Sequence, residues 1–330
     1  YTWNGDYWKN SDAKLKKAFS EKSGDVGEIN LSLFNSLQAA NIDAKLVVLS
    51  TRNNGLTSKL YPIIFDYNYV IIQAIINNKT YYLDATNKFS PFGQVPFKAI
   101  NGEARVLDFK GESYWVKLTP KYPSSINTTV RLKLNNDNEL EGSFMTRRTG
   151  YYAINQRKKL SLISEDKHVE NFEANYSDTE VETYRVNNIN NIEKPLSEIY
   201  KIKIISDEES LDKIRINPIL FSRLQKNPFK LKERNYPVDF GYSRKQNYSI
   251  NLIIPDDYEV TQLPKDIAIS LPHKGGSFIY KTIANGNSLN IYVRLNISRR
   301  IFSNEEYFAL KEFYKQIIIA ESSHIALKKK

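Results

Sequence analysis

Few residues of this chain could carry out catalysis or bind a metal. The chain has no cysteine, which excludes disulfides, thiolate metal sites and any thiol nucleophile. The three histidines, His168, His273 and His324, stand apart from one another without the paired spacing of a metal site, and we interpret each as a surface residue. Motifs for a serine nucleophile elbow, a dinucleotide loop or a phosphate-binding loop are absent. We therefore expect no cofactor and no metal.

Carboxylates are the remaining candidates. Asp66 and Asp84 both lie near a predicted hairpin that would face a cleft, although acids in a turn or at a strand end are usually structural. A hydrolytic pair of carboxylates comes from distant strands, so spacing alone does not reveal it. Tyrosines gather in the same region and are more often sheet packing than a platform for a sugar or peptide: Tyr61, Tyr67, Tyr69, Tyr81 and Tyr82.

The elements that must position these residues alternate between helix and strand over the first hundred residues. "NSDAKLKKAFSEKSG" (10–24) predicts a helix that Gly24 closes, and a second helix with one apolar face follows it and ends at "NID". "AKLVVLS" (44–50) predicts a strand, and "YVIIQAIINNKTYYLDAT" (69–86) predicts an antiparallel hairpin. Helices followed by an antiparallel meander indicate an α+β fold.

The pattern changes after about Asp108. "INTTVRLKLNNDNELEGSFMTRR" (126–148) predicts a hairpin, one or two short helices follow, and strands resume at 180–186 and 197–205. From 227 onward, short strands alternate with Pro- and Gly-bearing turns, as in an antiparallel β-sandwich. A final helix carries an apolar stripe that we expect to dock on the last sheet, with Ser303 and Glu306 as its capping box. We expect three domains, 1–108, 109–218 and 219–330.

Composition and charge limit the classes of partner. The net charge is +10, but Lys and Arg are scattered along the whole chain rather than gathered in one segment with aromatic residues, so we expect no nucleic-acid binding. The longest apolar run, "YVIIQAII" (69–76), has the length of a strand, so no membrane span is expected. At 330 residues, the chain is long enough for two or three domains.

Two segments, 24–37 and 65–86, together resemble the transglutaminase-like superfamily, which is related to papain-type enzymes. The resemblance is carried by "GDVGEINLSLFNSLQAANIDAKLVVLS", "FDYNYVIIQAI" and "KTYYLDATN", in the order and spacing of the family's nucleophile helix, base strand and acid motif. Further likeness, over most of 1–110 and 220–330, is to exported bacterial proteins in which such a domain is flanked by β-rich domains of unknown function. Longer relatives carry another N-terminal β domain, so the resemblance implies a fragment or a processed form.

Carried over residue by residue, the family's Cys-His-Asp triad falls on Val26, Tyr69 and Asp84. Valine cannot attack a carbonyl, and a tyrosine with an ordinary pKa near ~10 is a poor general base at neutral pH. The resemblance therefore implies a helices-on-antiparallel-sheet (papain-like half) core without thiol catalysis.

Two functions from different classes follow. The first is an inactive scaffold or binding module of the bacterial envelope or periplasm, with a cleft at Asp66, Tyr67, Tyr69 and Asp84 for an unknown peptide, glycan or protein partner. The alternative is a hydrolase that uses Asp66, Asp84 and Glu28. Packing of Val26 with Tyr69 in a filled cleft would argue against the hydrolase.

Overall fold

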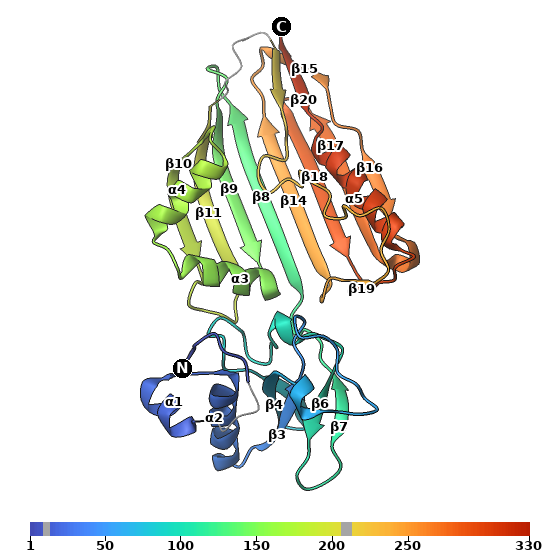
Figure 1. Ribbon diagram of the computed structural model, residues 1–330. Helices are drawn as coiled ribbons and strands as arrows, with labels where there is room; N and C mark the ends of the chain where they lie inside the picture. The colour runs from blue at the N-terminus through green and yellow to red at the C-terminus, as the bar shows by residue number, and fades with distance from the viewer. Residues whose placement is uncertain (9–13, 206–212) are drawn as a thin grey trace. The chain divides into compact units, whose positions relative to one another are not determined.

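Two main sheets organise the chain, one in each of the units that it forms, Tyr1–Tyr122 and Pro123–Lys330. The computed structural model in Figure 1 describes residues 1–8, 14–205 and 213–330. It confirms an α+β chain that contains large, mostly antiparallel sheets. Residues 10–13 of the first predicted helix lie outside the described residues.

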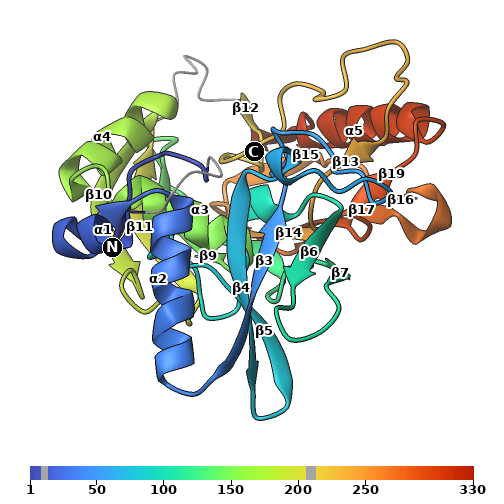
Figure 2. The ribbon, with the colours of Figure 1, turned by 60° about the horizontal axis from the view of Figure 1, so that its bottom comes forward.

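The first unit is built on a five-stranded antiparallel sheet of order β5-β4-β3-β6-β7, with α2 packed beside β3 and β4 (Figure 2). Its elements are β1 Thr2–Trp3, α1 Leu15–Glu21, β2 Ser23–Gly24, α2 Val26–Ala39, β3 Asp43–Leu49, the 3-10 turn η1 Ile64–Asp66, β4 Tyr69–Ile76, β5 Lys79–Leu83, η2 Phe97–Ala99, β6 Glu103–Leu107 and β7 Tyr114–Lys117.

Strand β4 is the centre of this unit. Its first six residues are buried, which explains why they form a continuous run rather than an apolar–polar alternation. Asn77 and Asn78 then adopt left-handed backbone angles, with φ of 50° and 60°, and so form the tight two-residue turn into β5. The predicted hairpin is confirmed.

Helix α2 confirms the second predicted helix, and Asp25 caps its start. The Asp25 carboxylate accepts a hydrogen bond from the Glu28 N–H at 2.8 Å, and the Glu28 carboxylate accepts one from the Asp25 N–H at 2.9 Å. The predicted role of Gly24 is wrong. Helix α1 ends at Glu21, Lys22 takes the left-handed conformation with φ of 52°, and Gly24 pairs with Trp3 in a short parallel bridge.

The second unit is built on an eight-stranded sheet of order β10-β11-β9-β8-β14-β18-β17-β16, and β12, β20 and β15 form a smaller sheet. Its elements are β8 Ser124–Leu134, β9 Leu140–Arg148, α3 Gly150–Leu160, α4 Glu165–Asn175, β10 Thr179–Asn187, β11 Leu196–Ile204, β12 Lys213–Ile216, β13 Val238–Asp239, β14 Arg244–Ile253, β15 Tyr258–Gln262, β16 Ile267–Ser270, η3 Pro272–Lys274, β17 Gly276–Asn285, β18 Ser288–Ile297, β19 Ile301–Phe302, α5 Tyr307–Glu321 and β20 Ile325–Lys329.

One face of the large sheet is covered and the other is open. The helices α3, α4 and α5 lie in front of the sheet in Figure 1, and the inward residues of α5 and of the smaller sheet join one apolar cluster with the buried sheet face. The predicted hairpin at 126–148 and the two short helices after it are confirmed.

The expected division into three domains differs from this arrangement. Strand β7 pairs with β6, so the segment after Asp108 belongs to the first unit. Strand β14 pairs in parallel with β8 along ten residue pairs, Arg244↔Ser124 to Ile253↔Lys133, so the expected boundary at 218 falls inside one unit. The region after 218 is therefore half of a shared sheet and not a separate β-sandwich.

The last helix packs as predicted but begins differently. Leu310 and Ile317 of α5 are fully buried, which confirms the apolar stripe. The Ser303 N–H donates to the Glu306 carboxylate at 2.9 Å, but the Ser303 hydroxyl bonds to Glu305 instead of the helix, so the predicted capping box is only half formed. Among the described residues, no helix has both the length and the apolar character of a membrane span.

Glu321, at the end of α5, provides a test of this packing. Burial raises its pKa to about 7, although the Leu224 N–H donates a hydrogen bond to its carboxylate at 2.8 Å. Because the pKa of Glu321 is higher in the folded state than in the unfolded state, its protonated carboxyl stabilises the fold at pH values below the unfolded pKa. This contribution is lost as the pH rises through about 7. We expect Glu321→Gln to match wild type near pH 4 and to exceed it by about 1–3 kcal/mol at pH 8. Urea unfolding at both pH values measures this; an equal difference at both would contradict it.

Candidate functional site

The positions of the expected triad come together in the first unit, but as a closed structural contact. Tyr69 begins β4 and Asp84 directly follows β5, so the hairpin brings the two side chains side by side. The Tyr69 hydroxyl donates to Asp84 Oδ2 at 2.7 Å and lies 2.9 Å from Thr86 Oγ1. Thr86 also donates to Asp84 Oδ1 from its N–H at 2.7 Å and its hydroxyl at 2.6 Å. Asp84 is therefore surrounded by donors.

Val26 and Tyr69 are both completely buried and belong to the same apolar cluster. Burial first, and then the charge of Asp84, raise the pKa of Tyr69 far above its ordinary value. The phenol accordingly stays neutral and acts as a hydrogen-bond donor, because forming a buried phenolate beside the Asp84 carboxylate is costly. This pair cannot take a proton from a nucleophile at neutral pH.

The N-terminal segment, residues 1–8, lies over these positions. The Asp6 carbonyl accepts from the Val26 N–H at 3.3 Å, and the Trp8 N–H donates to the Asn68 carbonyl at 3.1 Å. A Cβ placed on Gly27 would lie 2.7 Å from the Trp8 ring, so the indole packs directly on the first turn of α2.

Aromatic rings complete the cover. The Tyr7 ring meets the Tyr69 ring edge-on at 6.1 Å, and the Lys98 ammonium lies over the rings of Trp3 at 3.5 Å and Tyr69 at 4.7 Å. A groove of about 550 Å³ in this unit lies between α1 and α2, and residues such as Phe19, Leu33 and Ala85 line it, rather than Val26 or Tyr69. Within the described residues, packed rings thus lie over Val26 and Tyr69, where the cleft was expected.

Two of the carboxylates proposed for a hydrolase, Glu28 and Asp84, have separate structural partners. Glu28 belongs to the capping box and also accepts from the Lys14 N–H at 3.1 Å. Asp84 is bound by Tyr69 and Thr86. Asp66 ends the η1 turn, where its backbone carbonyl accepts from the Asn54 side chain at 3.0 Å, and neighbouring Tyr67 is buried.

Asn30 joins α2 to the hairpin and was not singled out from the sequence. The side chain is fully buried; its Nδ2 donates to the Val70 carbonyl at 2.8 Å, and its Oδ1 accepts from the Ala85 N–H at 2.8 Å. It therefore fixes the helix against both strands that carry Tyr69 and Asp84.

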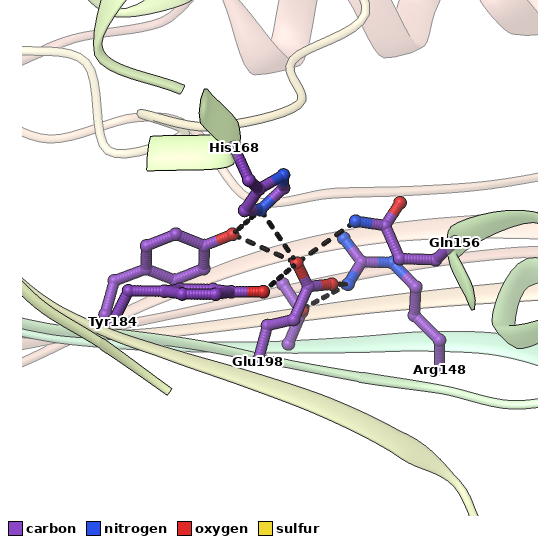
Figure 3. A network of polar contacts seen from close by, with 7 residues as sticks. Arg148, Gln156, His168, Tyr184 and Glu198 are labelled. Carbon is purple, nitrogen blue, oxygen red and sulfur yellow. Dashed lines mark hydrogen bonds and ion pairs between the residues drawn. The ribbon is translucent and has the colours of Figure 1, made fainter. Parts of the chain in front are cut away.

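The second unit contains a larger polar cluster around Glu198, a fully buried carboxylate on β11 (Figure 3). Arg148 of β9 donates to Glu198 Oε2, and Gln156 of α3 donates to Oε1 at 3.0 Å. The hydroxyls of Tyr184 and Tyr200 donate to Oε1 at 3.2 and 3.1 Å. Side chains from three strands and one helix thus converge on one carboxylate.

His168 of α4 completes this cluster. Its Nε2 lies 3.1 Å from Glu198 Oε1 and 2.8 Å from the Tyr200 hydroxyl, and its ring packs against Tyr184 with centroids 5.0 Å apart. The interpretation of His168 as a surface residue is therefore wrong, because only 16% of its side chain is exposed. His273 and His324 are exposed as expected.

Burial alone would raise the pKa of Glu198, but the hydrogen bond from His168 and the charge of Arg148 outweigh it and hold the pKa below its ordinary value. Burial and the Glu198 charge raise the pKa values of Tyr184 and Tyr200, so both stay neutral donors. The cluster places a histidine beside a carboxylate, but its donors all point inward at Glu198. This arrangement holds α3 and α4 on the sheet.

We expect Glu198→Gln to lower the free energy of unfolding by about 2–4 kcal/mol near pH 7, because Arg148 would lose its counter-ion in a largely buried position. Since the folded pKa of Glu198 is lowered, this difference should be present above about pH 4.3 and shrink as pH falls further. Hydrogen exchange of peptides from β9 and β11 measures the change.

Glu182→Gln is the matched control, since Glu182 forms an exposed ion pair with Lys201 on the adjoining strands. It removes the same charge and should cost less than about 0.5 kcal/mol. Equal effects of the two substitutions would contradict the role given to Glu198.

Comparison with known proteins gives limited matches. A family model described as a domain of unknown function with solved structure, DUF3858, matches residues 212–327. The chain is also similar to the crystal structure at 2.00 Å of a "putative protease" from Parabacteroides distasonis ATCC 8503, with 12% identity and a TM-score of 0.49. That match covers 95% of this chain and 46% of the other, so the chain spans less than half the length of its structural relative. No curated protein matches the chain.

Proposed function

We propose that the first unit is a transglutaminase-like fold without catalytic activity, and that the chain serves as a scaffold or binding module of the bacterial envelope. The envelope assignment and the family come from the resemblance of 24–37 and 65–86. The partner class that fits such a module is a peptide, a glycan or another protein.

The observation that carries the proposal is the hydrogen bond from Tyr69 to Asp84. A family triad needs a thiolate beside an imidazole that the acid orients. The resemblance aligns Tyr69 with the imidazole and Val26 with the thiol. In support of the proposal, Tyr69 donates its hydroxyl to Asp84, and Val26 is completely buried in the apolar core.

The alternative hydrolase finds less support. Glu28 and Asp84 each hold several hydrogen bonds that their removal would leave unsatisfied, and neither is aimed into a groove that the first unit offers. A carboxylate that acts as acid or base must reach a substrate and a water.

Val26→Cys tests the proposal cleanly, because the chain has no other thiol. We expect the new thiol to react with an aromatic disulfide reagent at least about a hundredfold more slowly than a free cysteine, since position 26 is completely buried, and to react fully on denaturation. Ser36→Cys, at an exposed position of the same helix, is the control and should react rapidly in the folded chain.

A second arm adds Tyr69→His to Val26→Cys and measures hydrolysis of amide and ester substrates. We expect no activity as long as the thiol is protected. Rapid labelling at position 26 would show that the cleft is open. Peptide or ester hydrolysis by the unmodified chain that Asp84→Asn abolishes, without loss of folding, would establish the hydrolase instead.

A further inference from the structure

The open face of the eight-stranded sheet carries a surface that the function proposed above does not use. Along β8, β14, β17 and β18, buried residues alternate with half-buried or exposed ones, so a single face points to solvent. Figure 1 shows the helices over the other face. We call the outward side chains of these four strands the open patch.

The open patch is basic. Its outward side chains include five cations and no acid; the cations are Arg131, Lys133, Lys245, Lys281 and Arg294. Each is exposed, and within the described part of the chain none forms an ion pair. On the far strands of the same face, by contrast, Lys201 pairs with Glu182 and Lys203 with Glu139. The four strands of the open patch thus carry a net positive charge on this face, and the adjoining strand β9 places Glu141 opposite Lys133 at its border.

An apolar group lies on the β17 side of the open patch. Tyr292 of β18 is 46% exposed, and Lys281 lies directly opposite it on β17, flanked by Ile279 and Ile283, which are 40% and 42% exposed. Ile253 on β14 is 42% exposed and stands apart from this group, opposite Ser288. Exposed Tyr and Arg side chains beside apolar ones are typical of a protein interface.

Four asparagines of the open patch, on β8, β14 and β18, bond to one another or to Ser288. Asn247 donates to Asn127 at 2.7 Å, and Asn251 donates to Asn290 at 3.0 Å and to Ser288 at 2.8 Å. A sugar ligand would need such amides for its hydroxyls, and a single-stranded nucleic acid would need several stacking rings where this surface offers Tyr292 alone. The groups left to contact a partner are cations and apolar side chains.

We propose that the open patch binds an acidic protein surface that also carries aromatic or aliphatic side chains. Ten-residue strands of about 33 Å, four abreast at ~4.8 Å, give a footprint of about 600 Å², close to the ~800 Å² that one partner contributes to a standard interface. The open patch lies on another unit than Tyr69 and Asp84, so this inference does not depend on the inactivity of that site.

The test uses the full chain and a fluorescent random copolymer of glutamate and tyrosine, compared with polyglutamate, polygalacturonate and an oligothymidylate. We expect saturable binding that is tightest for the copolymer, because only it supplies both acids and rings. The affinity should fall at least about tenfold between ~50 and ~200 mM salt. Absence of saturable binding, or equal or tighter binding of polygalacturonate or the oligonucleotide, would overturn the proposal.

Variants locate the binding. Lys281→Glu with Arg294→Glu should weaken copolymer binding at least about tenfold, and Tyr292→Ser should remove the preference for the copolymer over polyglutamate. Lys230→Glu with Lys232→Glu is the control of equal charge change; these exposed lysines flank Leu231, whose carbonyl accepts from Lys311 and Tyr307 of α5, over the covered face.

The control should bind within about twofold of wild type. An equal loss of copolymer binding in the control pair would contradict the placement of the binding site on the open patch. Arg131→Ser with Lys133→Ser provides a second test of the same surface if the first pair alters the thermal midpoint.

Discussion

The parallel pairing of β8 with β14 is the interaction on which the second unit depends. It joins strands 120 residues apart in sequence, Ser124 to Arg244 and onward through ten pairs, and thereby merges a sheet of β8 to β11 with a sheet of β14 to β18. Parallel pairing requires a crossover connection, and here that connection includes the helices α3 and α4. Both halves then share one apolar cluster, which runs from Val130 to Leu327. Without this pairing, each half of the sheet would expose the unpaired backbone groups of an edge strand and would lose part of the apolar packing over its buried face.

Asp84 in the first unit and Glu198 in the second each accept several hydrogen bonds, and the two differ in what they connect. Among the described residues, the side chains that donate to Asp84 are those of Tyr69 and Thr86, so it fixes the local geometry of one hairpin. Glu198 accepts from β9, β10, α3 and α4 as well as its own strand, and so ties the crossover helices to the sheet. A fully buried carboxylate such as Glu198 is tolerated only when its hydrogen bonds are satisfied, which explains its many donors.

The sequence predicted those elements whose cause is local. The β4–β5 hairpin follows from a β-branched run and an Asn-Asn turn, and α2 follows from an apolar stripe, so the sequence indicated both; the Asp25–Glu28 capping box became visible in the structure. The role of His168 was missed because Glu198 lies 30 residues later on a strand whose burial depends on the sheet around it. The expected domain boundary near 218 was wrong for a similar reason. The sequence pattern of a strand is the same whether its partner strand is near or distant in sequence.

The distribution of charge shows the same difference between what the local sequence reveals and what folding brings together. Along the chain the basic residues look scattered, because strands present alternate residues to opposite faces and the patch draws one or two from each of four strands. Folding brings Arg131, Lys281 and Arg294 onto one face of four strands that carry no acid on that face, at a cost in mutual repulsion. In the first unit, by contrast, the region expected to be open is covered by the aromatic rings of residues 1–8. The binding roles proposed above rest on these two features, the covered position of Tyr69 and the cations of the open face.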